Sequence, residues 1–164
     1  MKAVVVYESL WGNTAAIARA IAEGLGDGVR ALHTDEATAD ALAGVDLIVA
    51  GAPLLGFSLP TEQMIAAQGT AMPAPPKPAD VSHPAMRSWL AALPAGVGRS
   101  AAFETRMWWS PGSAAKTILT GLEAAGFAPL EREKFMVTGR YGPLKEGEIE
   151  RARAWGADLA RAMS

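Results

Sequence analysis

The sequence contains no cysteine among its 164 residues. This absence excludes disulfide bonds, thiolate nucleophiles, iron–sulfur ligation by cysteine and cysteine-bound zinc. Histidine is scarce as well, since His33 and His83 are the only two and lie far apart in the sequence. We therefore predict no metal site, and we expect both histidines to be solvent-exposed residues without a role.

An excess of basic residues is also lacking. The chain has 15 Lys and Arg against 17 Asp and Glu, a formal net charge of −2. Because nucleic acids and anionic membranes are bound by basic surfaces, we expect neither as a partner. The apolar run at the amino end, residues 3–7, is shorter than the roughly 7–15 residues of a secretory signal or the about 20 of a membrane span. These features predict a cytoplasmic protein.

Half of the residues are hydrophobic, and the length fits a single domain over residues 1–164. Short apolar runs alternate with segments of helical periodicity. The predicted strands are Ala3–Tyr7, Val29–His33, Asp46–Ala52, Arg99–Glu104 and Lys134–Thr138. The predicted helices start after the loop 8–14, at Ala37, near Pro84 with Ser82 as its cap, at Ser113 and at Glu148. Residues 69–84 hold five prolines and are predicted to be irregular.

This alternation predicts an α/β fold with a parallel sheet and helices on both faces, because strand–helix–strand crossovers are right-handed. In such open sheets, ligands bind beyond the carboxyl ends of the strands. Loops 8–14, 53–60 and 105–112 all follow predicted strands at that edge. A ligand site is therefore expected where these three loops meet.

The first of these loops has the ingredients of a phosphate site. Its residues are Ser9, Leu10, Trp11, Gly12, Asn13 and Thr14, directly before a predicted helix. A helix amino terminus offers unpaired N–H groups and a partial positive charge, and Gly12 allows close approach of the backbone. The loop matches neither the P-loop nor the dinucleotide-binding glycine pattern. The alternative is a turn that only caps the helix.

The sequence from Glu8 to Thr14 resembles the phosphate loop of the flavodoxin family, with Trp11 where that family often has Ser or Thr. The later runs 103–106, 111–115 and 142–144 resemble short flavodoxin-domain proteins. The resemblance implies a flavodoxin-like three-layer sandwich with a five-stranded parallel sheet in the order 2-1-3-4-5. It also implies non-covalently bound flavin mononucleotide (FMN), with the phosphate held by the loop after the first strand.

The same resemblance assigns the flavin ring to the loops after the third and fourth strands. The implied ring contacts are Pro53, Leu54, Leu55, Gly56, Phe57, Thr105, Arg106 and Trp108, with Trp109 as an alternative to Trp108. Apolar and aromatic side chains suit a planar ring. The two tryptophans are equally compatible with surface packing or a partner-binding patch. Arg106 is expected either to border the ring and raise its reduction potential or to pair with Glu104 on the surface.

A flavodoxin-like electron carrier is the function that the resemblance implies, with a reductase and an acceptor protein as partners. Such a carrier needs no general acid, base or nucleophile, and we predict no catalytic residue. One alternative is an FMN-dependent NAD(P)H or quinone oxidoreductase of the same fold, in which residues 69–84 roof the flavin. Another is a binding module without flavin.

Overall fold

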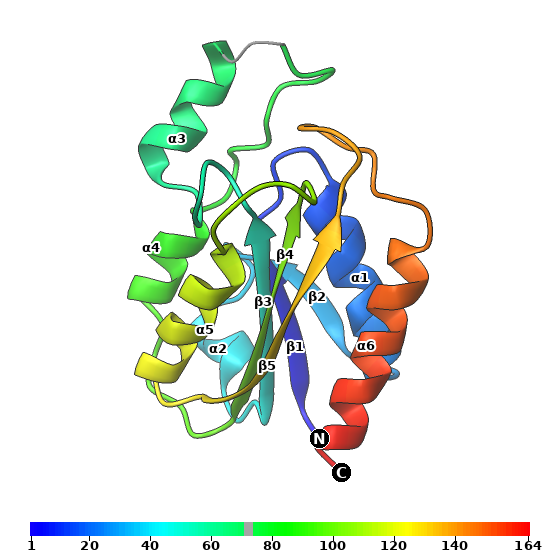
Figure 1. Cartoon of the computed structure of the whole chain (residues 1–164). Helices are drawn as coiled ribbons and strands as arrows, with labels where there is room; N and C mark the ends of the chain where they lie inside the picture. The colour runs from blue at the N-terminus through cyan, green and yellow to red at the C-terminus, as the bar shows by residue number, and fades with distance from the viewer. Residues whose placement is uncertain (71–73) are drawn as a thin grey trace.

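The structure is a computed structural model that describes residues 1–70 and 74–164. A five-stranded parallel sheet forms its middle layer, with the strand order β2-β1-β3-β4-β5 (Figure 1). The strands are β1 (Ala3–Tyr7), β2 (Arg30–His33), β3 (Leu47–Pro53), β4 (Arg99–Arg106) and β5 (Ala128–Met136). This confirms the predicted parallel sheet and its strand order.

Helices cover both faces of the sheet (Figure 1). One face carries α1 (Asn13–Leu25) and α6 (Glu148–Ala162). The other carries α2 (Ala39–Leu42), α4 (Met86–Ala91) and α5 (Ala114–Ala124). A short helix, α3 (Glu62–Ala66), and the 3₁₀ turn η1 (Ala67–Thr70) extend beyond the carboxyl edge of the sheet. Among the described residues, no helix is both long and apolar enough to cross a membrane.

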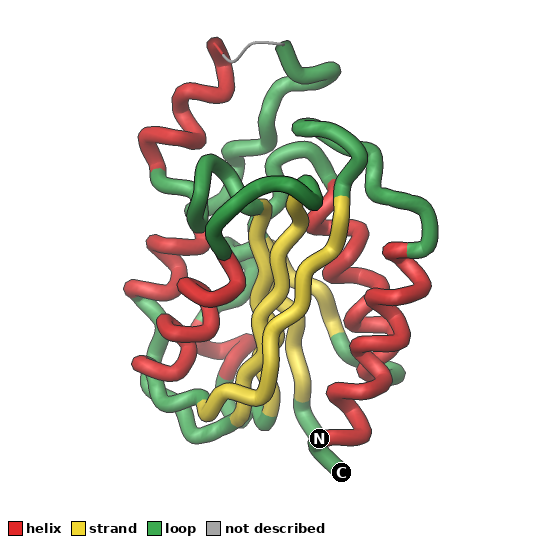
Figure 2. The backbone as a smooth tube through the Cα atoms, viewed as in Figure 1, coloured by secondary structure: helices red, strands yellow, loops and turns green. Residues whose placement is uncertain are grey.

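The apolar run of β1 is explained by burial on both faces of the strand. Val4 and Val6 belong to the core cluster under α2, α4 and α5. Val5 and Tyr7 belong to the cluster under α1 and α6. Because successive side chains of a strand point to opposite faces, a central strand of a three-layer fold needs apolar residues throughout. The loop that follows β1 therefore starts from a buried strand, at the same edge of the sheet as the loops that follow β3 and β4 (Figure 2).

The two helices α1 and α6 cross at glycines. A Cβ atom on Gly24 would lie 2.0 Å from the carbonyl oxygen of Arg153, and one on Gly156 would lie 2.3 Å from that of Ile21. Only glycine permits this close approach of the two backbones. Gly24 is therefore a packing residue, and α1 ends at Leu25 before Gly26.

Some predicted boundaries are wrong. Strand β5 begins at Ala128 rather than Lys134, because an edge strand tolerates the exposed charged residues that hide its pattern. Helix α4 begins at Met86 rather than after Ser82, whose hydroxyl donates to Asp80 instead. Helix α3 was not predicted. The predicted irregular segment, residues 69–84, begins inside η1, so the prediction is wrong at residues 69–70, and it includes residues 71–73, which lie outside the described residues.

Candidate functional site

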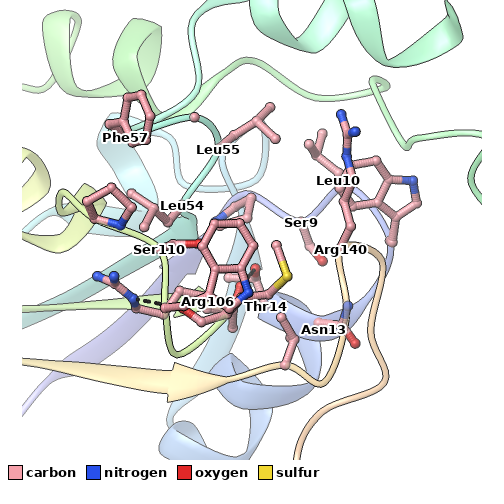
Figure 3. Close-up of a pocket in the computed structure, with 18 residues that line it drawn as sticks. Ser9, Leu10, Asn13, Thr14, Leu54, Leu55, Phe57, Arg106, Ser110 and Arg140 are labelled. Atoms are coloured by element: carbon pink, nitrogen blue, oxygen red, sulfur yellow. Dashed lines mark hydrogen bonds between the residues drawn. The ribbon is translucent and has the colours of Figure 1, made fainter. Parts of the chain in front are cut away.

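A cavity of about 560 Å³ opens at the carboxyl edge of the sheet (Figure 3). Its walls come from the loops that follow β1, β3 and β4, together with residues that follow β5. Strands β2 and β3 pair with opposite sides of β1, so the connections after β1 and β3 run to opposite sides of the sheet. This topology leaves a crevice at that point, where α/β proteins bind their ligands.

Twelve of the fourteen residues predicted for the site line this cavity. They are Ser9, Leu10, Trp11, Asn13, Thr14, Pro53, Leu54, Leu55, Gly56, Phe57, Thr105 and Arg106. Gly12 forms the turn beneath the cavity and does not line it. Trp108 is 81 % exposed and does not line it either, whereas its neighbour Trp109 does.

Six further residues line the cavity and were not among the fourteen predicted from the sequence. Met107, Trp109, Ser110 and Pro111 belong to the loop after β4. Val137 and Arg140 follow β5, a strand whose carboxyl end was not considered as a source of site residues. The rule that carboxyl ends of parallel strands share one edge points to them as well, once β5 is placed in the sheet.

One end of the cavity, which we call the turn end, is formed by residues 9–14. Gly12 has a φ of 96°, in the left-handed region that favours glycine, and precedes the first residue of α1. The backbone N–H of Gly12 donates to Ser9 Oγ over 3.1 Å, and the Thr14 hydroxyl lies 2.8 Å from that of Thr105. No side chain among the described residues caps α1. The first-turn N–H groups of this helix therefore point toward the cavity without a side-chain acceptor.

Two cations from distant segments approach the turn end. The Nζ atom of Lys77 lies 3.8 Å from the position that a Cβ on Gly12 would take. Arg140 lines the cavity on the side of Leu10, across from Phe57 (Figure 3). Its guanidinium stacks over Tyr141 at 5.5 Å from the ring centroid. Neither cation was predicted for the site, because both are far from the loop 8–14 in the sequence.

The opposite end, which we call the apolar end, is formed by residues 53–57 and 107–111. The backbone N–H of Leu54 donates to the carbonyl of Thr105 over 2.9 Å, which joins the two loops at their base. They also touch further out, since a Cβ on Gly112 would lie 1.9 Å from the carbonyl oxygen of Phe57. Phe57 and Trp109 are 70 % and 60 % exposed. This end is apolar and open to solvent.

Arg106 holds the loop at the apolar end in place. Its guanidinium donates to Glu104 over 3.1 Å and to the carbonyl of Gly112 over 2.9 Å. Glu104 also accepts bonds from the Ser113 hydroxyl and the Ala115 N–H. The Arg106 and Glu104 side chains are 10 % and 3 % exposed. The structure therefore has the pairing that the sequence left open, but as a buried pair that ties the start of the loop to its end.

Glu8 lies directly before the turn end and is fully buried. One carboxylate oxygen accepts the N–H of Met86, and the other has no partner among the described residues. Burial raises the pKa of Glu8 from 4.5 to about 7, and the bond from Met86 opposes this shift only in part. A buried carboxyl with a pKa near neutrality therefore directly precedes the turn end in the chain.

The two histidines lie side by side, although they are far apart in the sequence. Their ring centroids are 4.9 Å apart, and the side chain of His83 is only 3 % exposed. The prediction that both are solvent-exposed is therefore wrong. The crossover from β1 to β2 and the return of the chain at residues 80–84 bring them together, which no local pattern reveals.

No protein-family model matches the sequence, and a comparison with curated proteins finds no match. Solved structures do match over nearly the whole chain. The fold is similar to a flavodoxin from the domain Archaea, with a TM-score of 0.65, 22 % identity and 99 % coverage of each chain. It is also similar to oxidised Flavodoxin 1 from Bacillus cereus, with a TM-score of 0.63, 19 % identity and complete coverage of both chains. A flavodoxin, WrbA-like protein from Agrobacterium tumefaciens matches with a TM-score of 0.56, 20 % identity and coverage of 99 % and 96 %. These likenesses show a flavodoxin-like fold.

Proposed function

We propose that this flavodoxin-like chain binds one FMN in the cavity and carries electrons between protein partners. The observation that carries the proposal is the shape of the cavity, whose two ends differ in chemistry. The turn end suits a phosphate, and the apolar end suits a planar ring. Cavities of this size, roughly 300–1,000 Å³, are typical of cofactor sites.

The phosphate is assigned to the turn end because the amino terminus of α1 has no side-chain cap. Helix N–H groups and the helix dipole favour an anion at this position. The Nε1 atom of Trp11, a residue that lines the cavity, is buried without a hydrogen-bond partner among the described residues. Lys77 and Arg140 add positive charge on two sides. These groups fit a phosphomonoester.

The isoalloxazine ring is assigned to the apolar end. Leu54, Leu55 and Trp109 supply apolar surface there, and Phe57 comes from the same loop as the leucines (Figure 3). Aromatic and aliphatic faces stabilise a planar ring by burial and stacking. FMN, when bound, supplies the redox chemistry by accepting and releasing one or two electrons. The chain's own residues bind the group, orient it and keep water from its inner face.

An electron carrier needs a route for partner proteins to reach the ring. The apolar end supplies one, because Trp108 and Phe57 are largely exposed beside the cavity. The segment predicted to roof the flavin in an enzyme does not do so in its described part, since none of residues 74–84 lines the cavity. The open apolar end therefore favours a carrier over an enzyme with its own substrate pocket.

The first test compares FMN with riboflavin, which lacks the phosphate. FMN at about a hundredfold excess over its Kd adds roughly 2.7 kcal/mol to the free energy of unfolding. For a chain of this size, we expect Tm to rise by about 5–10 °C with FMN and much less with riboflavin. Equal shifts would contradict the phosphate assignment, and no shift with either compound would favour a binding module without flavin.

The second test addresses electron transfer. The FMN-loaded protein should accept electrons from an added flavin reductase and pass them to an acceptor protein. We expect negligible oxidation of NADPH by a quinone when the reductase is omitted. Sustained turnover without the reductase would show instead an FMN-dependent oxidoreductase of the same fold.

A further inference from the structure

A second cluster of potential ligands lies behind the turn end, outside the cavity. His33, Asp80 and His83 each offer one ligand atom, and these atoms all lie within 4.8 Å of one another. We propose that these three side chains bind a divalent transition-metal ion, with Zn²⁺ as the best fit. Two imidazoles and one carboxylate form a donor set typical of such ions, and water would complete the coordination.

The hydrogen bonds of His83 prepare one ring nitrogen for a cation. Its Nδ1 atom lies 3.3 Å from the carbonyl oxygen of Pro84, so a proton on Nδ1 is satisfied there. In this tautomer the Nε2 lone pair faces the carbonyl oxygen of Ser9 at 3.3 Å and Asp80 Oδ2 at 4.0 Å, whereas in the other tautomer Nε2–H donates to the Ser9 carbonyl. An unprotonated nitrogen beside two oxygen atoms is unfavourable unless a cation lies among them. Metal-binding histidines commonly donate their other N–H to a backbone carbonyl in this way.

His33 places a ring with an unpaired nitrogen beside Asp80 and His83. Its Nδ1 atom is buried and has no hydrogen-bond partner among the described residues. The ring packs between those of Tyr7 and His83, with centroid distances of 4.4 and 4.9 Å. A buried polar atom without a partner costs free energy, and a ligand at this ring would offset that cost.

Asp80 completes the cluster from the solvent side. Its Oδ1 atom accepts bonds from the N–H and hydroxyl of Ser82, which leaves Oδ2 on the side of His83. The Asp80 side chain is 46 % exposed, whereas that of His83 is 3 % exposed. The site therefore has two ligands on its protein side and one at its mouth, through which an ion and a coordinating water can enter.

Metal binding at this site would fasten the segment that follows residues 71–73 to the sheet. Asp80 N–H already donates to the carbonyl of Leu10 over 2.8 Å, and the Thr34 hydroxyl donates to Pro84 over 2.6 Å. Zinc–ligand bonds of about 2.0–2.1 Å require the ligand atoms to be roughly 3.4 Å apart. A small inward movement of the exposed Asp80 side chain and the histidine rings supplies this contraction.

The test uses the full chain after treatment with a chelator. Titration calorimetry with ZnCl₂ should show one site per chain, and MgCl₂ should show none, because imidazole ligands favour zinc over magnesium. Co²⁺ in place of Zn²⁺ should give the visible absorption of a four-coordinate site. Zn²⁺ should also raise Tm. The competing account is that a proton on His83 Nε2, shared with its oxygen neighbours, stabilises the cluster and that no metal binds. Absence of Zn²⁺ binding would overturn the proposed metal site and favour this account.

Three variants identify the ligands: His33→Gln, Asp80→Asn and His83→Gln. Each should weaken Zn²⁺ binding by about tenfold or more, with Tm in chelator close to that of the wild type. Asp35→Asn, another exposed carboxylate near the end of β2, is the matched control and should bind normally. If a histidine variant fails to fold, Asp80→Asn decides, because its side chain is half exposed and asparagine retains the bonds to Ser82. Unchanged affinity in Asp80→Asn would overturn the proposed site.

Discussion

The two ends of the cavity are built in different ways. The turn end consists of consecutive residues, 9–14, between a buried strand and the helix that follows it. The apolar end consists of two loops from different strands, joined by the bond from the Leu54 N–H to the carbonyl of Thr105 and by a close contact between Gly112 and Phe57. The turn end is therefore fixed by local backbone geometry, and the apolar end by contacts across the chain.

This difference predicts different responses to substitution. Changes at the apolar end should alter the free energy of unfolding and leave the preference for FMN over riboflavin intact. Changes at the turn end should alter that preference. Four substitutions, taken in order of decreasing effect, test this contrast.

Arg106→Ala should destabilise the protein most. It leaves Glu104 buried without its cationic partner and releases the carbonyl of Gly112. Loss of one member of a buried ion pair typically costs about 3–5 kcal/mol. We expect the free energy of unfolding to fall by an amount near the lower end of this range, because Ser113 and Ala115 still donate to Glu104. Urea unfolding measures this change.

Arg99→Ala is the matched control for Arg106→Ala, because Arg99 is exposed at the start of the same strand. It should change the free energy of unfolding by no more than about 0.5 kcal/mol. The ratio of FMN to riboflavin affinity should be retained in Arg106→Ala. Equal stability of both variants would show that the ion pair does not hold the apolar end.

Glu8→Gln should stabilise the protein at alkaline pH. The pKa of Glu8 is about 7 in the folded state, above its unfolded value of about 4.5, so the folded state binds the proton more tightly. Stability from this group is therefore present below about pH 4.5 and is lost as pH rises to about 7. Glutamine keeps an acceptor for Met86 without the charge. We expect a gain of about 2–3 kcal/mol at pH 8 and little gain at pH 5.

Glu148→Gln is the control with the opposite sign. The hydrogen bonds from Arg151 lower the pKa of Glu148, so its charge stabilises the folded state above the unfolded pKa. This variant should lose stability at pH 8 and approach the wild type in acid. Unfolding curves at the two pH values, measured with chelator present, distinguish the variants. If Glu8→Gln and Glu148→Gln changed the free energy of unfolding in the same direction at pH 8, a buried unpaired carboxyl and a paired one would not differ as proposed.

Gly12→Ala should weaken FMN binding through the turn end. The φ of 96° at Gly12 is unfavourable for alanine by about 1–2 kcal/mol. This strain would shift the backbone N–H groups of the turn away from the positions that suit a phosphate. We expect the Kd for FMN to rise about tenfold or more, with little change for riboflavin. Gly28→Ala has a similar φ of 83° and open space around it, so it controls for strain alone.

Lys77→Met should have the smallest effect. Lys77 is exposed, and its charge acts on a phosphate through solvent. We expect a weakening of FMN binding of a few-fold at low salt that disappears at high salt, because ions screen exposed charges. Lys116→Met, on the exposed side of α5, should leave binding unchanged. If the affinity for FMN depended on salt identically in both variants, Lys77 would not contribute to phosphate binding.

The fold could be predicted from the sequence because its signals are local. An apolar run such as residues 3–7 indicates a strand buried on both faces, and the spacing of Ile17, Ile21 and Leu25 indicates a helix. The strands and helices found by these patterns are confirmed, apart from several boundaries. Strand β5 was placed too late because its first half is charged and exposed. Local patterns fail where an element lies at the edge of the sheet.

Local sequence patterns were enough to predict the order of the strands and of all helices but α3, the turn at Gly12 and most residues of the cavity wall. These depend on residues close together in the chain and on the shared edge of parallel strands. Three contacts became visible only in three dimensions: Arg106 pairs with a buried Glu104, Lys77 approaches Gly12, and His33 contacts His83. Such contacts arise when crossovers and long loops pack together. They depend on the sum of many distant interactions, which no short pattern in the sequence encodes.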